Sequence, residues 1–157
     1  MHFELPPRGT YGPEIPRALR PLLRAGSGIG NLMFRLGLKV QGRPLLKLTT
    51  VGARTGKSRH AVLGWFPDHD RSDSWLVVAS SGGSARHPGW AHNLAESPDR
   101  VQVDVGDGPF DGTAEILAGA EREEVWKRVV EMAPGYGAYT TKTDRELPIF
   151  RLARKPG

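Results

Sequence analysis

The stretch that decides the fold reads Trp75-Leu76-Val77-Val78-Ala79-Ser80-Ser81-Gly82-Gly83-Ser84-Ala85-Arg86-His87-Pro88-Gly89-Trp90-Ala91-His92-Asn93-Leu94. Its first five residues form a short apolar run that predicts a buried strand. The strand should break at Gly82-Gly83, where the backbone can adopt positive φ and a flat ligand can approach main-chain atoms. Pro88 suits the first turn of a helix. The stretch therefore predicts either a cofactor site or an ordinary strand–loop–helix junction.

The composition is that of one globular domain. The chain has 157 residues, of which 38% are hydrophobic and 25% charged, and this length suffices for a core of its own. The absence of cysteine excludes a disulfide framework, a thiolate metal site and a cysteine nucleophile. Because no apolar run approaches the ~18 residues of a membrane span and no signal-peptide core begins the sequence, we expect a cytoplasmic protein.

The net charge of +5 is unevenly distributed. Residues 1–60 contain eleven Lys and Arg against two acidic residues, a balance of +9, whereas the remaining residues hold eleven against fifteen, a balance of −4. A basic first third predicts an anionic partner, such as lipid headgroups, a polyanionic cofactor or nucleic acid. A nucleic-acid partner is not expected, because the basic third has neither a helix-turn-helix nor an aromatic platform for base stacking.

The N-terminal part divides into a Pro- and Gly-rich segment and a helical one. Residues 1–13 are expected to be loosely held. Residues 16–38 show helical spacing of apolar side chains with basic residues between them, interrupted at Gly26-Ser27-Gly28. A basic amphipathic helix either lies on an anionic membrane surface or packs on its domain with the arginines in water.

A cationic turn follows. Residues 44–50 and 61–66 read as the two strands of a hairpin, and the turn between them carries Arg54, Lys57 and Arg59. Arg offers a planar fork and Lys a point charge, so this turn suits phosphate or carboxylate groups unless it is simply solvated. It is not a P-loop, because only three residues separate Gly52 from Gly56.

The remaining pattern predicts an α+β fold of about six mostly antiparallel strands with helices packed outside. A second hairpin spans 101–105 and 112–117, a helix spans 121–132 and ends at Pro134-Gly135, a polar and aromatic segment follows, and 147–152 forms a closing strand. No dinucleotide-binding fingerprint occurs. A hydrolase remains a minor alternative without a GxSxG motif, and the Asp68-His69-Asp70 turn is more typical of a solvated loop than of a metal site.

The chain resembles the deazaflavin-dependent nitroreductase family of actinobacteria over about residues 30–152. Four motifs in family order carry this resemblance, namely Leu48–Arg59, Val78–Gly83, Arg86–Leu94, and Tyr136–Tyr139 with Thr143–Pro148. Members of the family are split β-barrel oxidoreductases that use coenzyme F420. The resemblance therefore implies an FMN-binding-like split barrel at residues 41–157, preceded by an N-terminal tail and basic helix at residues 1–40.

The resemblance also implies roles for individual residues. The cationic turn would hold the phosphate and acidic oligoglutamate tail of the coenzyme, through Arg54, Lys57, Ser58 and Arg59. The strand end would face the deazaflavin ring with Ala79, Ser80, Ser81, Gly82 and Gly83, and the ring pocket would be lined by His87, Trp90 and Asn93. Tyr136, Tyr139 and Ser80 are the expected catalytic residues on the acceptor side, although the tyrosines could instead pack the last helix against the barrel.

The implied reaction is hydride transfer from the reduced deazaflavin to an electron-poor acceptor such as a quinone, an enone or a nitroaromatic compound. A hydroxyl group of Tyr136, Tyr139 or Ser80, or a water molecule, would supply the proton. A lipophilic acceptor would place the protein at the inner face of the membrane. The sequence departs from relatives at Val62, near a family proline, and at Ala133, near an additional tyrosine. The alternative function is a non-catalytic carrier of F420 or FMN.

Overall fold

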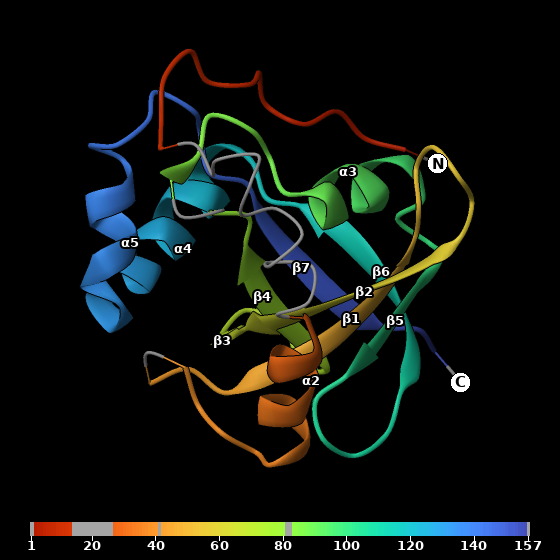
Figure 1. The fold of residues 1–157 in the computed structure, drawn as a ribbon. Helices are drawn as coiled ribbons and strands as arrows, with labels where there is room; N and C mark the ends of the chain where they lie inside the picture. Colours follow the sequence, from red (N-terminus) through yellow and green to blue (C-terminus); the bar gives the residue numbers. More distant parts are fainter. Residues whose placement is uncertain (1, 14–26, 41, 81–82, 157) are drawn as a thin grey trace.

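The computed structural model describes residues 2–13, 27–40, 42–80 and 83–156. In these residues seven antiparallel strands form one sheet that curls into half a barrel (Figure 1). The strands are β1 (Leu45–Val51), β2 (Ser58–Gly64), β3 (Phe66–Pro67), β4 (Ser74–Val78), β5 (Val101–Asp104), β6 (Phe110–Ile116) and β7 (Ile149–Arg154), in the spatial order β2-β1-β5-β6-β7-β4-β3. The predicted α+β split barrel is therefore confirmed.

Helices pack on both faces of the curled sheet (Figure 1), with α3 against one face and α4 against the other. They are α2 (Ser27–Arg35), α3 (Gly89–Glu96), α4 (Gly119–Met132) and α5 (Pro134–Tyr139). Both predicted hairpins are present, because β1 pairs with β2 and β5 pairs with β6. Within the described residues, no helix has both the length and the apolar character required to cross a bilayer.

The strands bury side chains on both faces. In β4, Val77 packs in the core cluster beneath α3, whereas its neighbour Val78 packs in the cluster beneath α4. This alternation follows from the period of two along a strand. Leu94 closes the first cluster and Val125 and Val129 close the second. The run from Trp75 to Ala79 is apolar throughout because both of its faces are covered.

One sequence expectation about element ends was wrong. Phe66 does not end the second strand, which stops at Gly64; it lies in β3, where Phe66 pairs with Leu76. The predicted end of the helix before Pro134-Gly135 is confirmed, since α4 ends at Met132. Pro134 then occupies the first turn of the further helix α5, a position that proline tolerates because no intrahelical N–H bond is needed there. Residues 14–26, the first part of the predicted basic helix, lie outside the described residues.

The N-terminal segment was expected to be loose, and this expectation was also wrong. Residues 2–13, hereafter the strap, run across the top of the molecule from α3 toward α5 (Figure 1). The Thr10 N–H donates to Asp144 Oδ1 at 2.7 Å and the Gly9 N–H donates to the Ala85 oxygen at 2.8 Å. A Cβ on Gly9 would lie 2.8 Å from atoms of Thr143 and Asp144. Glycine here reflects close docking, not mobility.

A buried ion cluster joins four elements away from the strap. Arg151 of β7 is 1% exposed and donates to Asp68 Oδ2 at 2.5 Å, Glu115 Oε1 at 2.6 Å and Glu121 Oε2 at 3.3 Å. Burial of the Asp68 carboxyl raises its pKa, but hydrogen bonds from Arg151 and Ser74 outweigh burial, and the net pKa is lowered. Asp68 is thus a structural partner of Arg151.

Candidate functional site

The cationic turn is closed by its own backbone. The Gly52 N–H donates to the Lys57 oxygen at 2.7 Å, and the Gly56 N–H donates to the Gly52 oxygen at 2.9 Å. Gly56 has φ +68°, a left-handed conformation that favours glycine. A Cβ on Gly52 would lie 2.9 Å from Thr55 Oγ1. These glycines allow a turn tight enough to gather three cations.

Asn93 of α3 fixes the position of this turn. Its Oδ1 accepts a hydrogen bond from the Ala53 N–H at 2.9 Å, and its Nδ2 donates to Thr50 Oγ1 at 3.0 Å. Both polar atoms of the amide are therefore satisfied by the end of β1 and the start of the turn. The side chain holds helix and turn at a fixed separation.

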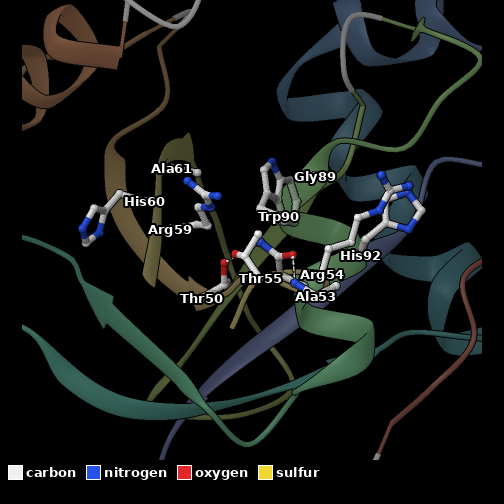
Figure 2. A pocket seen from close by; sticks show the side chains of 12 residues that line it. Thr50, Ala53, Arg54, Thr55, Arg59, His60, Ala61, Gly89, Trp90 and His92 are labelled. Carbon is white, nitrogen blue, oxygen red and sulfur yellow. Dashed lines mark hydrogen bonds between the residues drawn. The ribbon is translucent and has the colours of Figure 1, made fainter. Parts of the chain in front are cut away.

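A cavity of about 790 Å³ lies between the turn and α3. It is lined by Thr50, Gly52, Ala53, Arg54, Thr55, Arg59, His60, Ala61, Gly89, Trp90, His92 and Asn93. In Figure 2, Arg54 and His92 lie on one side, Arg59 and His60 on the other, and the Trp90 indole between them. Its volume is in the range of small-molecule sites, and cations with an aromatic surface suit an anionic ligand.

The cavity contains some of the predicted cofactor residues and two histidines without a predicted role. Arg54, Arg59, Trp90 and Asn93 line it, whereas Lys57 and Ser58 are exposed on the turn outside the lining residues. His60 and His92 are the additional polar residues. The sequence could have indicated His92, because His92 follows Gly89 by three residues and both therefore lie on one face of the predicted helix.

Arg145 binds both ends of the loop that follows β4, hereafter the strand-end loop, of which residues 79, 80, 83 and 84 are described. Arg145 Nη1 donates to the Ala79 oxygen at 3.0 Å, Nη2 donates to the Ser80 oxygen at 2.7 Å, and Nε donates to the Ser84 oxygen at 2.8 Å. Gly83 adopts φ +82° and its N–H donates to the Ser80 oxygen. Ser81 and Gly82, predicted to face the deazaflavin, lie outside the described residues. Sequence analysis gave Arg145 no role.

His87 is buried beside this loop and does not line the cavity. Its Nδ1 receives a hydrogen bond from Arg145 Nη1 at 2.7 Å, and its Nε2 lies 2.7 Å from the Pro6 oxygen. Arginine cannot accept and a carbonyl cannot donate, so His87 carries its proton on Nε2. Burial lowers the pKa of His87, the bond to Pro6 opposes this, and the charge of Arg145 adds to the lowering. The ring is therefore neutral at neutral pH.

The two tyrosines lie on α5 and contact each other edge-on, with ring centroids 5.5 Å apart. Tyr136 also packs against Phe66 and borders a separate cavity of about 170 Å³ beneath α2, together with Arg43. Burial and the neighbouring Tyr139 raise the pKa of Tyr136, with Arg43 acting in the opposite direction. The backbone oxygen of Tyr139 lies 3.5 Å from the Cβ position of Gly83. This end of α5 thus touches the strand-end loop.

The fold and this site define a class: a split-barrel protein with a cation-lined cavity at the tip of a hairpin. The sequence model of the F420H(2)-dependent quinone reductase family matches residues 30–153, and the chain belongs to this family. The resemblance to F420-using split-barrel enzymes is thereby confirmed, and coenzyme F420 is the cofactor.

Similar proteins agree with this assignment. The F420H(2)-dependent quinone reductase Rv1261c of Mycobacterium tuberculosis is 37% identical over 125 residues, which cover 77% of this chain and 81% of that protein. The solved structure of an F420-H2 dependent reductase, FDR-A, is 41% identical with a TM-score of 0.60, covering 70% of this chain and 94% of the other. A solved domain-swapped dimer is 36% identical, with a TM-score of 0.61 and coverage of 84% and 98%.

Proposed function

We propose that this protein transfers a hydride from reduced coenzyme F420 to a quinone, with enones and nitroaromatic compounds as further candidate acceptors. The single observation that carries the proposal is the cavity between the cationic turn and α3, where Arg54 and Arg59 flank the Trp90 indole. A non-catalytic carrier would bind the coenzyme equally well. Steady-state oxidation of the reduced coenzyme by a quinone separates an enzyme from a carrier.

The donor set of the cavity fits the polar part of the coenzyme. Arg54 and Arg59 are exposed guanidinium groups that can each bind a phosphate or carboxylate through two parallel hydrogen bonds. His60 and His92 add ring nitrogens on either side of the same cavity. A coenzyme with a phosphate and a string of carboxylates gains more from this set than FMN does, because FMN has one phosphate group. Lys57 and Ser58 would meet the end of the tail on the outside of the turn.

The strand-end loop and α5 supply the reacting side of the proposed site. The bound coenzyme supplies the hydride. The chain supplies orientation through Ala79, Ser80 and Gly83, and a proton through a hydroxyl group. Tyr139 is the preferred donor, because its backbone adjoins Gly83. Tyr136 is an alternative, since its raised pKa keeps the phenol protonated at neutral pH. Ser80 remains a candidate for orienting the acceptor.

The first test removes the two cavity arginines together. Arg54→Ala with Arg59→Ala is expected to raise the Kd for oxidised F420 about 10- to 1000-fold, because each charge-assisted contact contributes ~1.5–3 kcal/mol before screening by solvent. Fluorescence titration measures the Kd. Turnover at saturating coenzyme should fall much less, since these residues contact the tail.

The matched control is Arg71→Ala with Lys127→Ala. It removes two exposed positive charges that do not line the cavity, and it changes the net charge equally. Its Kd should stay close to that of the parent. An equal loss of affinity in both double variants would mean that net charge, and not the cavity, binds the coenzyme.

The second test concerns the proton donor. Tyr139→Phe retains the ring and should leave the Kd for the coenzyme within a few-fold, while turnover with a quinone drops by about 100-fold or more, a typical contribution of a general acid. Stopped-flow and steady-state absorbance of the coenzyme measure both. A loss confined to Tyr136→Phe would assign the acid to Tyr136, and full turnover in both variants would contradict a role for the α5 phenols.

We also propose that the protein works in the cytoplasm at the inner face of the membrane. The support is an apolar stripe around α2, where Ile29, Leu32 and Leu36 are 65%, 55% and 63% exposed. Arg35 and Lys39 are exposed beside it. Apolar side chains flanked by cations favour an anionic lipid surface, where a lipophilic quinone is found.

The third test is therefore cosedimentation with vesicles of phosphatidylcholine and phosphatidylserine. We expect binding that weakens with salt, and a reduction of about 10-fold or more when Ile29, Leu32 and Leu36 are replaced together by Ser, given ~1.5–3 kcal/mol for each buried apolar side chain. Met132→Ser, which changes an exposed apolar residue on α4, is the control. Binding that is absent, or equal in all three proteins, would exclude the membrane contact.

A further inference from the structure

The chain has two deeply buried arginines with different partners. Arg151 is surrounded by three carboxylates. Arg145 is 3% exposed and has no carboxylate partner within the described residues; its hydrogen bonds go to three backbone oxygens and to His87. Burying a guanidinium without a counter-ion is costly. The contacts of Arg145 therefore point to a role that a neutral side chain could not fill.

The three carbonyl groups lie at the two ends of the strand-end loop. They belong to Ala79 and Ser80 before Gly83 and to Ser84 after it, so one planar guanidinium joins both ends of the loop. In a planar trans peptide the C=O and the next N–H point in opposite directions. By holding the Ala79 oxygen, Arg145 turns the Ser80 N–H away from itself. The direction of the Ser80 N–H is thus set by Arg145.

The segment that contains Arg145, residues 143–145, also binds the strap. Thr143 Oγ1 donates to the Tyr11 oxygen at 2.6 Å, and Asp144 accepts hydrogen bonds from the backbone and side chain of Thr10. His87 continues the connection, because it accepts from Arg145 on one side and donates to Pro6 on the other. Three consecutive residues therefore bind the strap and the strand-end loop at once.

We propose that Arg145 is a positioning residue for coenzyme binding, and that it joins the strap to the strand-end loop so that docking of the strap sets the positions of Ala79, Ser80 and Ser84 at the two ends of the loop. The proposal rests on the proposed function, because it assumes that this loop meets the coenzyme. The proposal adds residues that influence coenzyme affinity from behind the loop. They include the strap, which lies more than sixty residues before the loop in the sequence.

The connection through His87 requires a neutral imidazole. The charged or titratable groups that face His87 are Arg145 and, from α3, His92 with its ring centroid 5.9 Å away; the strap contributes only the Pro6 carbonyl. Protonation of His87 would direct a second N–H at the Arg145 guanidinium. Because the folded pKa lies below the ordinary value of 6.5, the contact is fully present above about pH 6.5 and is lost as the pH falls through this lowered pKa.

The decisive comparison is Arg145→Lys against Arg151→Lys. Each substitution keeps the positive charge and removes a buried planar guanidinium group. For Arg145→Lys we expect the Kd for oxidised F420 to rise about 10-fold or more, and amide hydrogen exchange to accelerate in both residues 83–87 and residues 2–13. Arg151→Lys should lower the unfolding midpoint but leave the Kd and both exchange patterns unchanged.

A second pair keeps the proposal testable if Arg145→Lys does not fold. His87→Gln can still accept from Arg145 and donate to Pro6, and should retain coenzyme affinity from pH 7.5 to pH 5.5. His87→Leu cannot do either and should weaken binding at both pH values. The parent should match the Gln variant at pH 7.5 and move toward the Leu variant as the pH falls through the lowered pKa of His87.

The outcomes separate this proposal from the proposed function. Exchange is measured without coenzyme, so it tests the coupling of strap and loop by itself. If the parent does not bind F420, the proposed function fails and the affinity role of Arg145 fails with it. If the parent binds F420 but Arg145→Lys or His87→Leu binds it equally well, Arg145 is only a structural residue and the proposal is overturned.

Discussion

The side-chain amide of Asn93 is the interaction on which the candidate site depends most directly. It bonds to the Ala53 N–H and the Thr50 hydroxyl, and so holds the cationic turn at a fixed distance from α3. All three residues of this contact, Asn93, Thr50 and Ala53, line the cavity. Arg54 and Arg59 can then face a common space while remaining solvated, which avoids the cost of burying their charges.

The arginine side chains fall into two groups that differ in burial. The arginines at the cavity are exposed and can bind a ligand anion, whereas Arg145 and Arg151 are buried and organise the chain itself. This division explains how one small domain combines a polyanion site with a stable core. The cavity charges need no partner within the protein because water screens them. Each guanidinium nitrogen of the two buried arginines has a hydrogen-bond partner, from carboxylates around Arg151 and from carbonyls and His87 around Arg145.

Much of the fold could be predicted from local patterns. The apolar run at Trp75–Ala79, the glycines of the cationic turn and the spacing in α3 each carry their structural meaning within about ten residues. The strap and Arg145 could not be predicted this way, because Thr10 bonds to Asp144 across 134 positions and Arg145 reaches Ala79 across 66. His87 was expected at the ring pocket, but its partners, Pro6 and Arg145, are equally remote. The sequence identified the exposed site better than the buried frame that supports it.

The central claim is that the cavity at the cationic turn binds coenzyme F420. Amide hydrogen exchange of the parent protein with and without oxidised F420 tests it most directly. The account predicts protection concentrated in residues 52–57 and 89–93, with a second protected stretch at residues 83–85. Protection centred instead on Lys47, Gln102 and Asp104, which border a different cavity of about 290 Å³ lined by residues of β1 and β5, would contradict this assignment.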